Sequence, residues 1–262
     1  MFRIWVCFWF AVCGGAAVAQ PAKTGAERSS VVEASDKRFA LVIGNSAYKH
    51  MGVLANPVND ARELAATLQK IAVSVEVVLD ADRGAMIAAL SRLSRAAEDA
   101  DLVIIHFSGH GIEINGSNYL LPVSAALNQP GDAGMQAIAF EQVYAAISHV
   151  RGVKVILLDA CRDNPIAGQL GLPRRRGLAA PSPPKDTLVA YATRHGEVAE
   201  DGPPGSTSPF TGALIKNIEE PIDIRVMFQK VRDDVLIATK FRQGPFTYGH
   251  LSGPDYQLAH TK

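Results

Sequence analysis

The chain has 262 residues, 48% of them hydrophobic, which is enough for one α/β domain with a sizeable core. Its 26 Lys and Arg residues balance its 26 Asp and Glu residues, so charge gives no indication of nucleic acid or of a membrane surface as a partner. After residue 20 no stretch reaches about 18 uninterrupted apolar residues, which argues against a membrane-spanning helix in that part.

The first residues have the pattern of a secretory signal peptide. They read MFRIWVCFWFAVCGGAAVAQ, with a short basic start, an apolar stretch from Ile4 to Cys13 and small residues before Gln20. We therefore expect residues 1–19 to be removed and the mature protein to be periplasmic or secreted, without membrane contact of its own. A retained membrane anchor is the alternative, and a lipid anchor on Cys13 is a weaker one.

Residues 20–37 are polar and aperiodic, which predicts a disordered leader, and the folded domain is expected over 38–262. Cys7 and Cys13 leave with the signal peptide, so Cys161 is the single cysteine of the expected mature chain. A lone thiol cannot form an internal disulfide. It is therefore either an inert buried group or a free reactive one.

Short runs rich in β-branched and apolar residues predict about six strands. Most runs are apolar on both faces, as in a sheet that helices cover on both sides. The runs are RFALVIG (38–44), VSVEVVL (73–79), DLVIIHF (101–107), NYLLPV (118–123), VKVILLDA (153–160) and TLVAYAT (187–193).

Segments with helical spacing of apolar residues separate most of these strands. Asn56 is the expected cap of a first helix that starts at Pro57, and Asp82 is the expected cap of a second helix from Arg83 to about Ala97. Further helices are predicted within 139–150, 208–220 and 223–240. This alternation predicts a three-layer α/β fold, with a mostly parallel sheet and helices on both of its faces.

Reactive residues follow two of the most apolar predicted strands. DLVIIHF runs into the segment SGHG with His110 and Gly111, and VKVILL runs into DAC, which ends at Cys161. Because ligands of a parallel sheet collect at the carboxyl ends of its strands, neighbouring strands would bring this imidazole and this thiol together. Histidine is the natural base for a thiol, whose ordinary pKa is about 8.5. The backbone N–H groups of Gly111 and Cys161 are expected to hold an oxyanion.

Four blocks, RFALVIGNSAY, NPVNDA, FSGHG and LLDACRDNP, occur in this order. Together they resemble the caspase-like cysteine peptidases, and specifically the bacterial metacaspase-like (orthocaspase) branch. His110 precedes Cys161 by about 50 residues, which agrees with the spacing in caspases. The resemblance implies the caspase fold and a Cys–His dyad peptidase, with Cys161 as nucleophile, His110 as general base and no obligatory third member.

Two aspartates separate this chain from the caspases proper. Asp159 stands where caspases carry Gln, two residues before the cysteine, and the upstream block carries Asp60 where caspases place a basic residue. The resemblance to metacaspases implies that both line an acidic S1 pocket, to which Ser108 of the SGHG block is also assigned. Independently, Asp159 and Cys161 project to the same face of a strand, and a buried carboxylate favours a guanidinium. The expected substrates are therefore peptides or proteins with Arg or Lys, and not Asp, before the cleaved bond.

Each aspartate also has a simpler interpretation. Asp60 would suit the first turn of a helix through the helix dipole, and Asp159 would suit a backbone hydrogen bond at a strand end. The histidine two positions before Ser108, His106, lies in an apolar run and is expected to be a core residue.

Two long loops, 162–186 and 194–208, are expected to be functional or mobile because they exceed ordinary connections. The first carries the basic run PRRRGLA. An enzyme with an acidic S1 pocket would cut its own loop after Arg174, Arg175 or Arg176; the alternative is a solvated charged patch.

No metal or cofactor is expected. The histidines lack the short spacing of a zinc site, and the DAD segment at 80–82 lacks the glycine and ligand ladder of an EF-hand. Activation by calcium is implied by the resemblance to metacaspases alone. The rival function is a catalytically silent caspase-fold module that binds a partner or serves as a scaffold. The physiological substrate, the oligomeric state and the role of the C-terminal tail stay open at this point.

Overall fold

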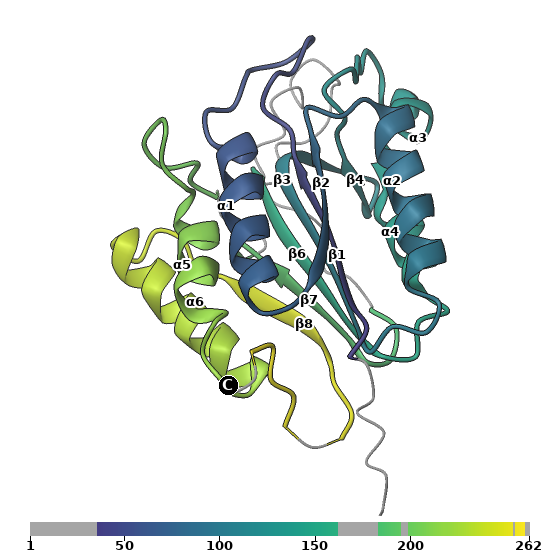
Figure 1. The fold of residues 1–262 in the computed structure, drawn as a ribbon. Helices are drawn as coiled ribbons and strands as arrows, with labels where there is room; N and C mark the ends of the chain where they lie inside the picture. Colours follow the sequence, from purple (N-terminus) through teal and green to yellow (C-terminus); the bar gives the residue numbers. More distant parts are fainter. Residues whose placement is uncertain (1–35, 162–182, 195–198, 254, 260–262) are drawn as a thin grey trace, which may run out of the picture. The chain divides into compact units, whose positions relative to one another are not determined.

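A mostly parallel β-sheet forms the centre of the computed structural model, which describes residues 36–161, 183–194, 199–253 and 255–259 (Figure 1). The order of its six main strands is β2-β1-β3-β6-β7-β8, and only β8 runs antiparallel to its neighbour. These strands are β1 (Arg38–Gly44), β2 (Ser74–Leu79), β3 (Leu102–Ile114), β6 (Val153–Cys161), β7 (Thr187–Tyr191) and β8 (Phe246–His250). There are also two short strands, β4 (Ser117–Leu120) and β5 (Ile138–Ala139). β4 pairs antiparallel with the last four residues of β3, and β5 pairs antiparallel with β4.

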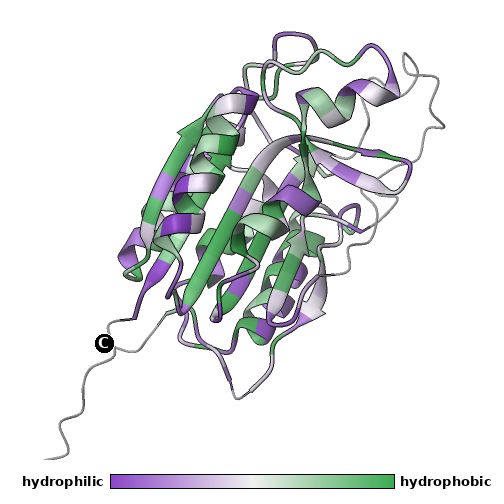
Figure 2. Ribbon diagram, turned by 90° about the vertical axis from the view of Figure 1, so that its right-hand side faces the viewer, coloured by the Kyte–Doolittle hydropathy of each residue, from purple (hydrophilic) through white to green (hydrophobic). Residues whose placement is uncertain are grey.

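Helices cover both faces of the sheet, as the alternating sequence pattern predicts. One apolar cluster joins the sheet to α1, α5 and α6, and a second joins the opposite face to α2 and α4. Figure 2 shows apolar residues concentrated along the strands between these layers. The helices are α1 (Pro57–Lys70), α2 (Arg83–Ala96), α3 (Ala133–Gln136), α4 (Phe140–Ile147), α5 (Pro209–Asn217) and α6 (Ile224–Ala238), with a 3₁₀ turn at Pro130–Asp132. Within the described ranges, no helix combines the length and apolar character needed to cross a bilayer.

Nearly all residues of β3 are buried, and successive side chains belong alternately to the two apolar clusters. Leu102 and Ile104 belong to the cluster on the α1 side, whereas Val103 and Ile105 belong to the cluster on the α2 side. Residues two apart on a strand share a face. The residues that follow in β3 therefore also alternate between the α1 side and the α2 side of the sheet.

Three sequence expectations about the strands need correction. β3 does not end at Phe107 but continues through the SGHG segment to Ile114. The run NYLLPV forms only the short β4, which pairs antiparallel with this extension of β3 outside the main sheet. The sixth main strand is instead β8, whose exposed, non-alternating side chains gave no strand signal.

The predicted caps behave differently from each other. The carboxylate of Asp82 accepts a hydrogen bond from the backbone N–H of Ala85 at 2.8 Å, so it caps α2 as expected. Asn56 precedes α1, but its side chain makes no cap hydrogen bond, and the prediction of a side-chain cap was wrong. Its amide group instead binds the carbonyl oxygens of Asp201 and Pro203. The side chain that local sequence assigned to the helix cap therefore binds a loop that is distant in sequence.

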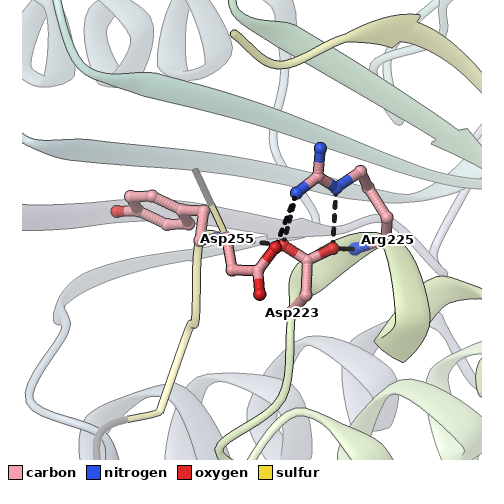
Figure 3. Close-up of polar contacts among 4 residues, drawn as sticks. Asp223, Arg225 and Asp255 are labelled. Atoms are coloured by element: carbon pink, nitrogen blue, oxygen red, sulfur yellow. Dashed lines mark hydrogen bonds and ion pairs between the residues drawn. The ribbon is translucent and has the colours of Figure 1, made fainter. Parts of the chain in front are cut away.

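The C-terminal segment lies against the start of α6. Arg225 donates to the carboxylate of Asp223 at 2.7 Å and pairs with Asp255 at 3.3 Å (Figure 3). The backbone N–H of Tyr256 also donates to Asp223, and the carbonyl of Tyr256 accepts from Ile224. The C-terminal part of the chain therefore closes one edge of the sheet through β8 and then fastens to α6.

Close contact between β1 and α1 depends on Gly44. A Cβ at this position would lie 2.2 Å from the carbonyl oxygen of Pro57 and 2.7 Å from Cβ of Ala61. We expect Gly44→Ala to lower the free energy of unfolding by about 1–3 kcal/mol, because α1 must move away from the sheet. Urea unfolding measures the loss. Gly131→Ala is the control, since a Cβ there meets nothing within 4 Å, and equal losses in the two variants would contradict the assignment.

Candidate active site

Two neighbouring parallel strands bring the predicted dyad positions together. The register of β3 and β6 pairs Ser108 with Asp159 and His110 with Cys161. These residues of β3 lie inside the strand and not beyond its end, which corrects the expectation from the sequence. The backbone of Cys161 ends β6, whereas its side chain lies outside the described part of the chain.

Gly109, between Ser108 and His110, has a backbone that a side chain would not tolerate. Its φ is +156°, and a Cβ there would lie 2.5 Å from the hydroxyl of Tyr48 and 2.9 Å from the ring of Phe107. Glycine is therefore required at this position so that Tyr48 can approach the main chain next to His110.

His110 is buried, and its two ring nitrogens have different environments. Nε2 lies 2.7 Å from the carbonyl oxygen of Gly52. A carbonyl only accepts, so Nε2 carries the hydrogen, and in the neutral ring Nδ1 keeps a free lone pair. Nδ1 is buried and has no hydrogen-bond partner among the described side chains and backbone groups. Burial lowers the pKa of His110, opposed by the hydrogen bond to Gly52. Burial thus favours the neutral imidazole, in which Nδ1 is the nitrogen that can accept a proton.

Tyr48 holds His110 in place, and sequence reasoning did not single it out. Its hydroxyl accepts a hydrogen bond from the backbone N–H of His110 at 2.7 Å and donates to the carbonyl of Leu121 at 3.0 Å. Its ring lies against the imidazole, with 4.5 Å between ring centroids. Tyr48 belongs to the quoted block RFALVIGNSAY, but nothing local in that block indicates a contact with His110.

The two aspartates and the serine expected in one pocket are close in space. The carboxylate of Asp60, fully buried in α1, accepts a hydrogen bond from the hydroxyl of Ser108 at 3.0 Å and from the backbone N–H of Ser208 at 2.8 Å. Asp159, 6% exposed, accepts from the hydroxyl of Ser208 and from that of Thr211 at 2.8 Å. The simpler interpretations, a helix dipole contact and a backbone hydrogen bond at a strand end, leave these side-chain hydrogen bonds unexplained.

Burial raises the pKa of both carboxyl groups. Desolvation, together with the nearby charge of Asp159, raises the pKa of Asp60 to about 8. Desolvation also raises the pKa of Asp159 to about 6, against the hydrogen bonds of Ser208 and Thr211, which lower it. Near neutral pH this pair therefore carries less than two negative charges.

Ser208 and Thr211 were missed by sequence reasoning. Ser208 caps α5 by accepting a hydrogen bond from the backbone N–H of Thr211 at 2.9 Å. A serine before a helix is a recognisable cap signal, but its second contact, to Asp159, depends on tertiary packing.

Asp201 is a third acidic residue beside the pair. Its carboxylate accepts the backbone N–H of Ala55 at 2.8 Å, just before α1. Desolvation is the largest cause of the raised pKa values of Asp60 and Asp159, and the negative charge of Asp201 adds to both. The loop from 199 to 208 therefore lies beside Asp60 and Asp159, and these three aspartates form the acidic side of the site.

The remaining predicted residues are placed as follows. His106 is fully buried in β3, as expected for a core residue, and burial lowers its pKa to about 3. Arg174, Arg175 and Arg176 lie outside the described residues. Among the residues that are described, no group of three or more His, Cys, Asp or Glu side chains is arranged to hold a metal ion.

The family model with the description "Caspase domain" matches residues 37–256, which is most of the chain. The protein therefore belongs to the caspase-domain family of cysteine peptidases, and the expected three-layer α/β fold is that of a caspase domain. A search of curated proteins found no significant match.

Removing the Tyr48 hydroxyl tests its structural role beside His110. We expect Tyr48→Phe to lower the free energy of unfolding by about 1–3 kcal/mol, because the N–H of His110 loses its buried acceptor and the carbonyl of Leu121 keeps only the donor from Asn45. Chemical unfolding measures this loss. Tyr119→Phe is the control, since the hydroxyl of half-buried Tyr119 forms no hydrogen bond with a described residue; similar losses in both would show that the Tyr48 contacts contribute nothing.

The raised pKa of Asp60 predicts a pH-dependent stability difference. The folded-state pKa lies above the ordinary value of 3.8, so protonated Asp60 favours folding, and this contribution is lost as pH rises toward about 8. Asp60→Asn has no proton to lose. Relative to wild type, it should therefore gain stability with rising pH over this window, by at most about 1.4 kcal/mol per pH unit.

Unfolding curves at several pH values measure this difference. A difference between Asp60→Asn and wild type that does not change with pH over this window would mean that folding does not raise the pKa of Asp60.

Proposed function

We propose that the protein is a cysteine endopeptidase that cleaves peptide bonds after Arg or Lys, with Cys161 as nucleophile and His110 as general base. The observation that carries the proposal is the pairing of His110 with Cys161 on adjacent parallel strands, directly beside the buried pair Asp60 and Asp159. We assign the chain to the metacaspase-like branch of its family on the same two aspartates.

Nδ1 of His110 is the proposed base because Nε2 is already bonded to Gly52. The thiol of Cys161 passes its proton to Nδ1, and the thiolate attacks the carbonyl carbon before the cleaved bond. The backbone N–H groups of Gly111 and Cys161 are proposed to bind the resulting oxyanion. His110 then returns the proton to the leaving amine, and an acyl-enzyme remains.

Water completes the cycle with the same groups in the reverse order. His110 takes a proton from the water that attacks the acyl carbon, and the proton returns to the sulfur as the thioester bond breaks. The products are a carboxylate peptide and the restored thiol. The Tyr48 and Gly52 contacts support this role because they keep the ring in one orientation through both halves of the reaction.

The acidic side of the site supports the preference for a basic residue. Asp60, Asp159 and Asp201 offer negative charge, and none of the ion pairs between described residues involves Asp60 or Asp159. A guanidinium carries the missing positive charge and five N–H donors. Ser108 is proposed to contribute its hydroxyl to the same pocket.

We also propose that the enzyme is exported through residues 1–19 and acts in the periplasm or outside the cell. Residues 1–35 lie outside the described part, so this proposal depends on the sequence pattern of the N-terminus. The proposed partners are peptide or protein substrates, and neither nucleic acid nor a membrane is required.

Fluorogenic peptides that end in Arg or in Asp test the activity. Under reducing conditions, with and without calcium, purified wild type should release the fluorophore from the Arg peptide only. Cys161→Ala and His110→Ala should each lose at least about 10³-fold in kcat/KM. Asp159→Lys should raise KM for the Arg peptide, because it reverses the charge of the pocket. If neither peptide is cleaved in any condition, the chain is a binding or scaffold module and the proposal is wrong.

Self-processing is a separate expectation. Incubated wild type should be cut after Arg174, Arg175 or Arg176, and the intact mass should fall accordingly by mass spectrometry. Cys161→Ala protein, treated in the same way, should keep its mass. An uncut wild-type chain in an active preparation would refute the self-processing proposal and leave the peptidase proposal standing.

A further inference from the structure

Ser208 links the two buried aspartates through two different groups. Its backbone N–H donates to Asp60 at 2.8 Å, and its hydroxyl donates to Asp159. The same hydroxyl oxygen accepts the backbone N–H of Thr211 at the start of α5. A hydroxyl has one hydrogen, so this arrangement directs the hydrogen at Asp159. Ser208 thus joins α1, β6 and α5 in one polar unit.

Among the described residues, no cation pairs with either carboxylate of this unit. The other described donors to the two carboxylates are also neutral: the hydroxyl of Ser108 to Asp60, and the hydroxyl and backbone N–H of Thr211 to Asp159. Of the titratable groups that face the pair, Asp201 adds negative charge. His106, which lies 3.5 Å from the hydroxyl of Thr211, is kept neutral by burial, and burial also lowers the pKa of His110.

Two full negative charges are costly in such a place. Both side chains are almost completely removed from water, and hydroxyl donors compensate a carboxylate only in part. Without a bound cation, the state of lowest free energy is therefore the one in which one of the two carboxyl groups is protonated. A bound cation reverses this balance, because it supplies the opposite charge at close range.

We propose that the unit Asp60–Ser208–Asp159 binds a basic substrate side chain in exchange for a proton, with Ser208 as the positioning residue that holds the two carboxyl groups together. The inference rests on the proposed function and adds how the pocket selects and regulates. The substrate cation keeps all of its own protons, and one proton passes from the carboxyl pair to the solvent. The N–H donors of the guanidinium bind carboxylate oxygens beside Ser208, which keeps its hydrogen bonds to both carboxylates.

Binding of a basic peptide should therefore strengthen as pH rises. Release of one proton makes the dissociation constant fall about tenfold per pH unit while the pair is still protonated, up to about pH 8. A neutral side chain displaces no proton. The pocket consequently discriminates against neutral side chains more strongly at higher pH.

The test uses full-length Cys161→Ala protein, which binds substrate peptides without cleaving them, and two peptides that differ only in Arg or its neutral isostere citrulline. Fluorescence anisotropy gives the dissociation constants between about pH 6 and about pH 8. Calorimetry in buffers of different ionisation enthalpy counts the protons released. The Arg peptide should release about one proton and bind about tenfold more tightly per pH unit, whereas the citrulline peptide should change less than about twofold.

Two further variants in the same background assign the proton. Asp60→Asn should bring proton release close to zero and flatten the pH dependence for the Arg peptide. Ser208→Ala keeps the backbone donor to Asp60 but loses the hydroxyl donor to Asp159; it should weaken Arg binding about tenfold near neutral pH, and Ser208→Thr should restore it. Thermal unfolding checks that each variant is folded, and Ser208→Ala stays informative if Asp60→Asn is not.

The outcomes separate the two proposals. If the Arg peptide binds more tightly than the citrulline peptide but releases no proton, the exchange is wrong and the basic preference stands. If both peptides bind alike at every pH, the basic preference falls and the exchange falls with it. Full proton release from Asp60→Asn would show that Asp60 does not carry the exchanged proton.

Discussion

The parallel pairing of β3 with β6 is the interaction on which the site depends. Its register opposes Ser108 to Asp159 and His110 to Cys161, so both pairs of residues proposed for the site follow from one ladder of backbone hydrogen bonds. A slip by one residue would turn every side chain of a strand to the opposite face. The apolar residues that alternate between the two core clusters resist such a slip. The packing of the sheet therefore fixes which residues of β3 and β6 lie opposite one another.

Around this ladder, the ionisable side chains of His110, Asp60 and Asp159 are bound by neutral hydrogen-bonding groups. Burial lowers the pKa of His110, and Gly52 and Tyr48 orient its ring and backbone. The described groups that bind Asp60 and Asp159 are hydroxyls and backbone amides, and none of them is a cation. Burial of two carboxyl groups in this way reduces the stability of the folded protein, and functional sites often carry this kind of cost. The same cost favours a ligand that brings positive charge.

Much of the fold could be predicted from local pattern, and the exceptions have physical reasons. Apolar runs identified the buried strands because both of their faces need apolar residues. β8 gave no such signal, since its side chains are mostly exposed. His110, Cys161 and the two aspartates could be predicted from motifs, but Tyr48, Ser208 and Asp201 could not. Their roles depend on hydrogen bonds between segments far apart in the sequence, which neither propensity nor spacing records.

The central claim, that His110 and Cys161 act on one another across β3 and β6, is tested most directly by the pH dependence of alkylation at Cys161. The rate with iodoacetamide, followed by mass spectrometry of the Cys161 peptide, reports the thiolate. In wild type the apparent pKa should lie below the ordinary thiol value of about 8.5, and in His110→Ala it should return to about that value. Identical profiles in the two proteins would contradict the account.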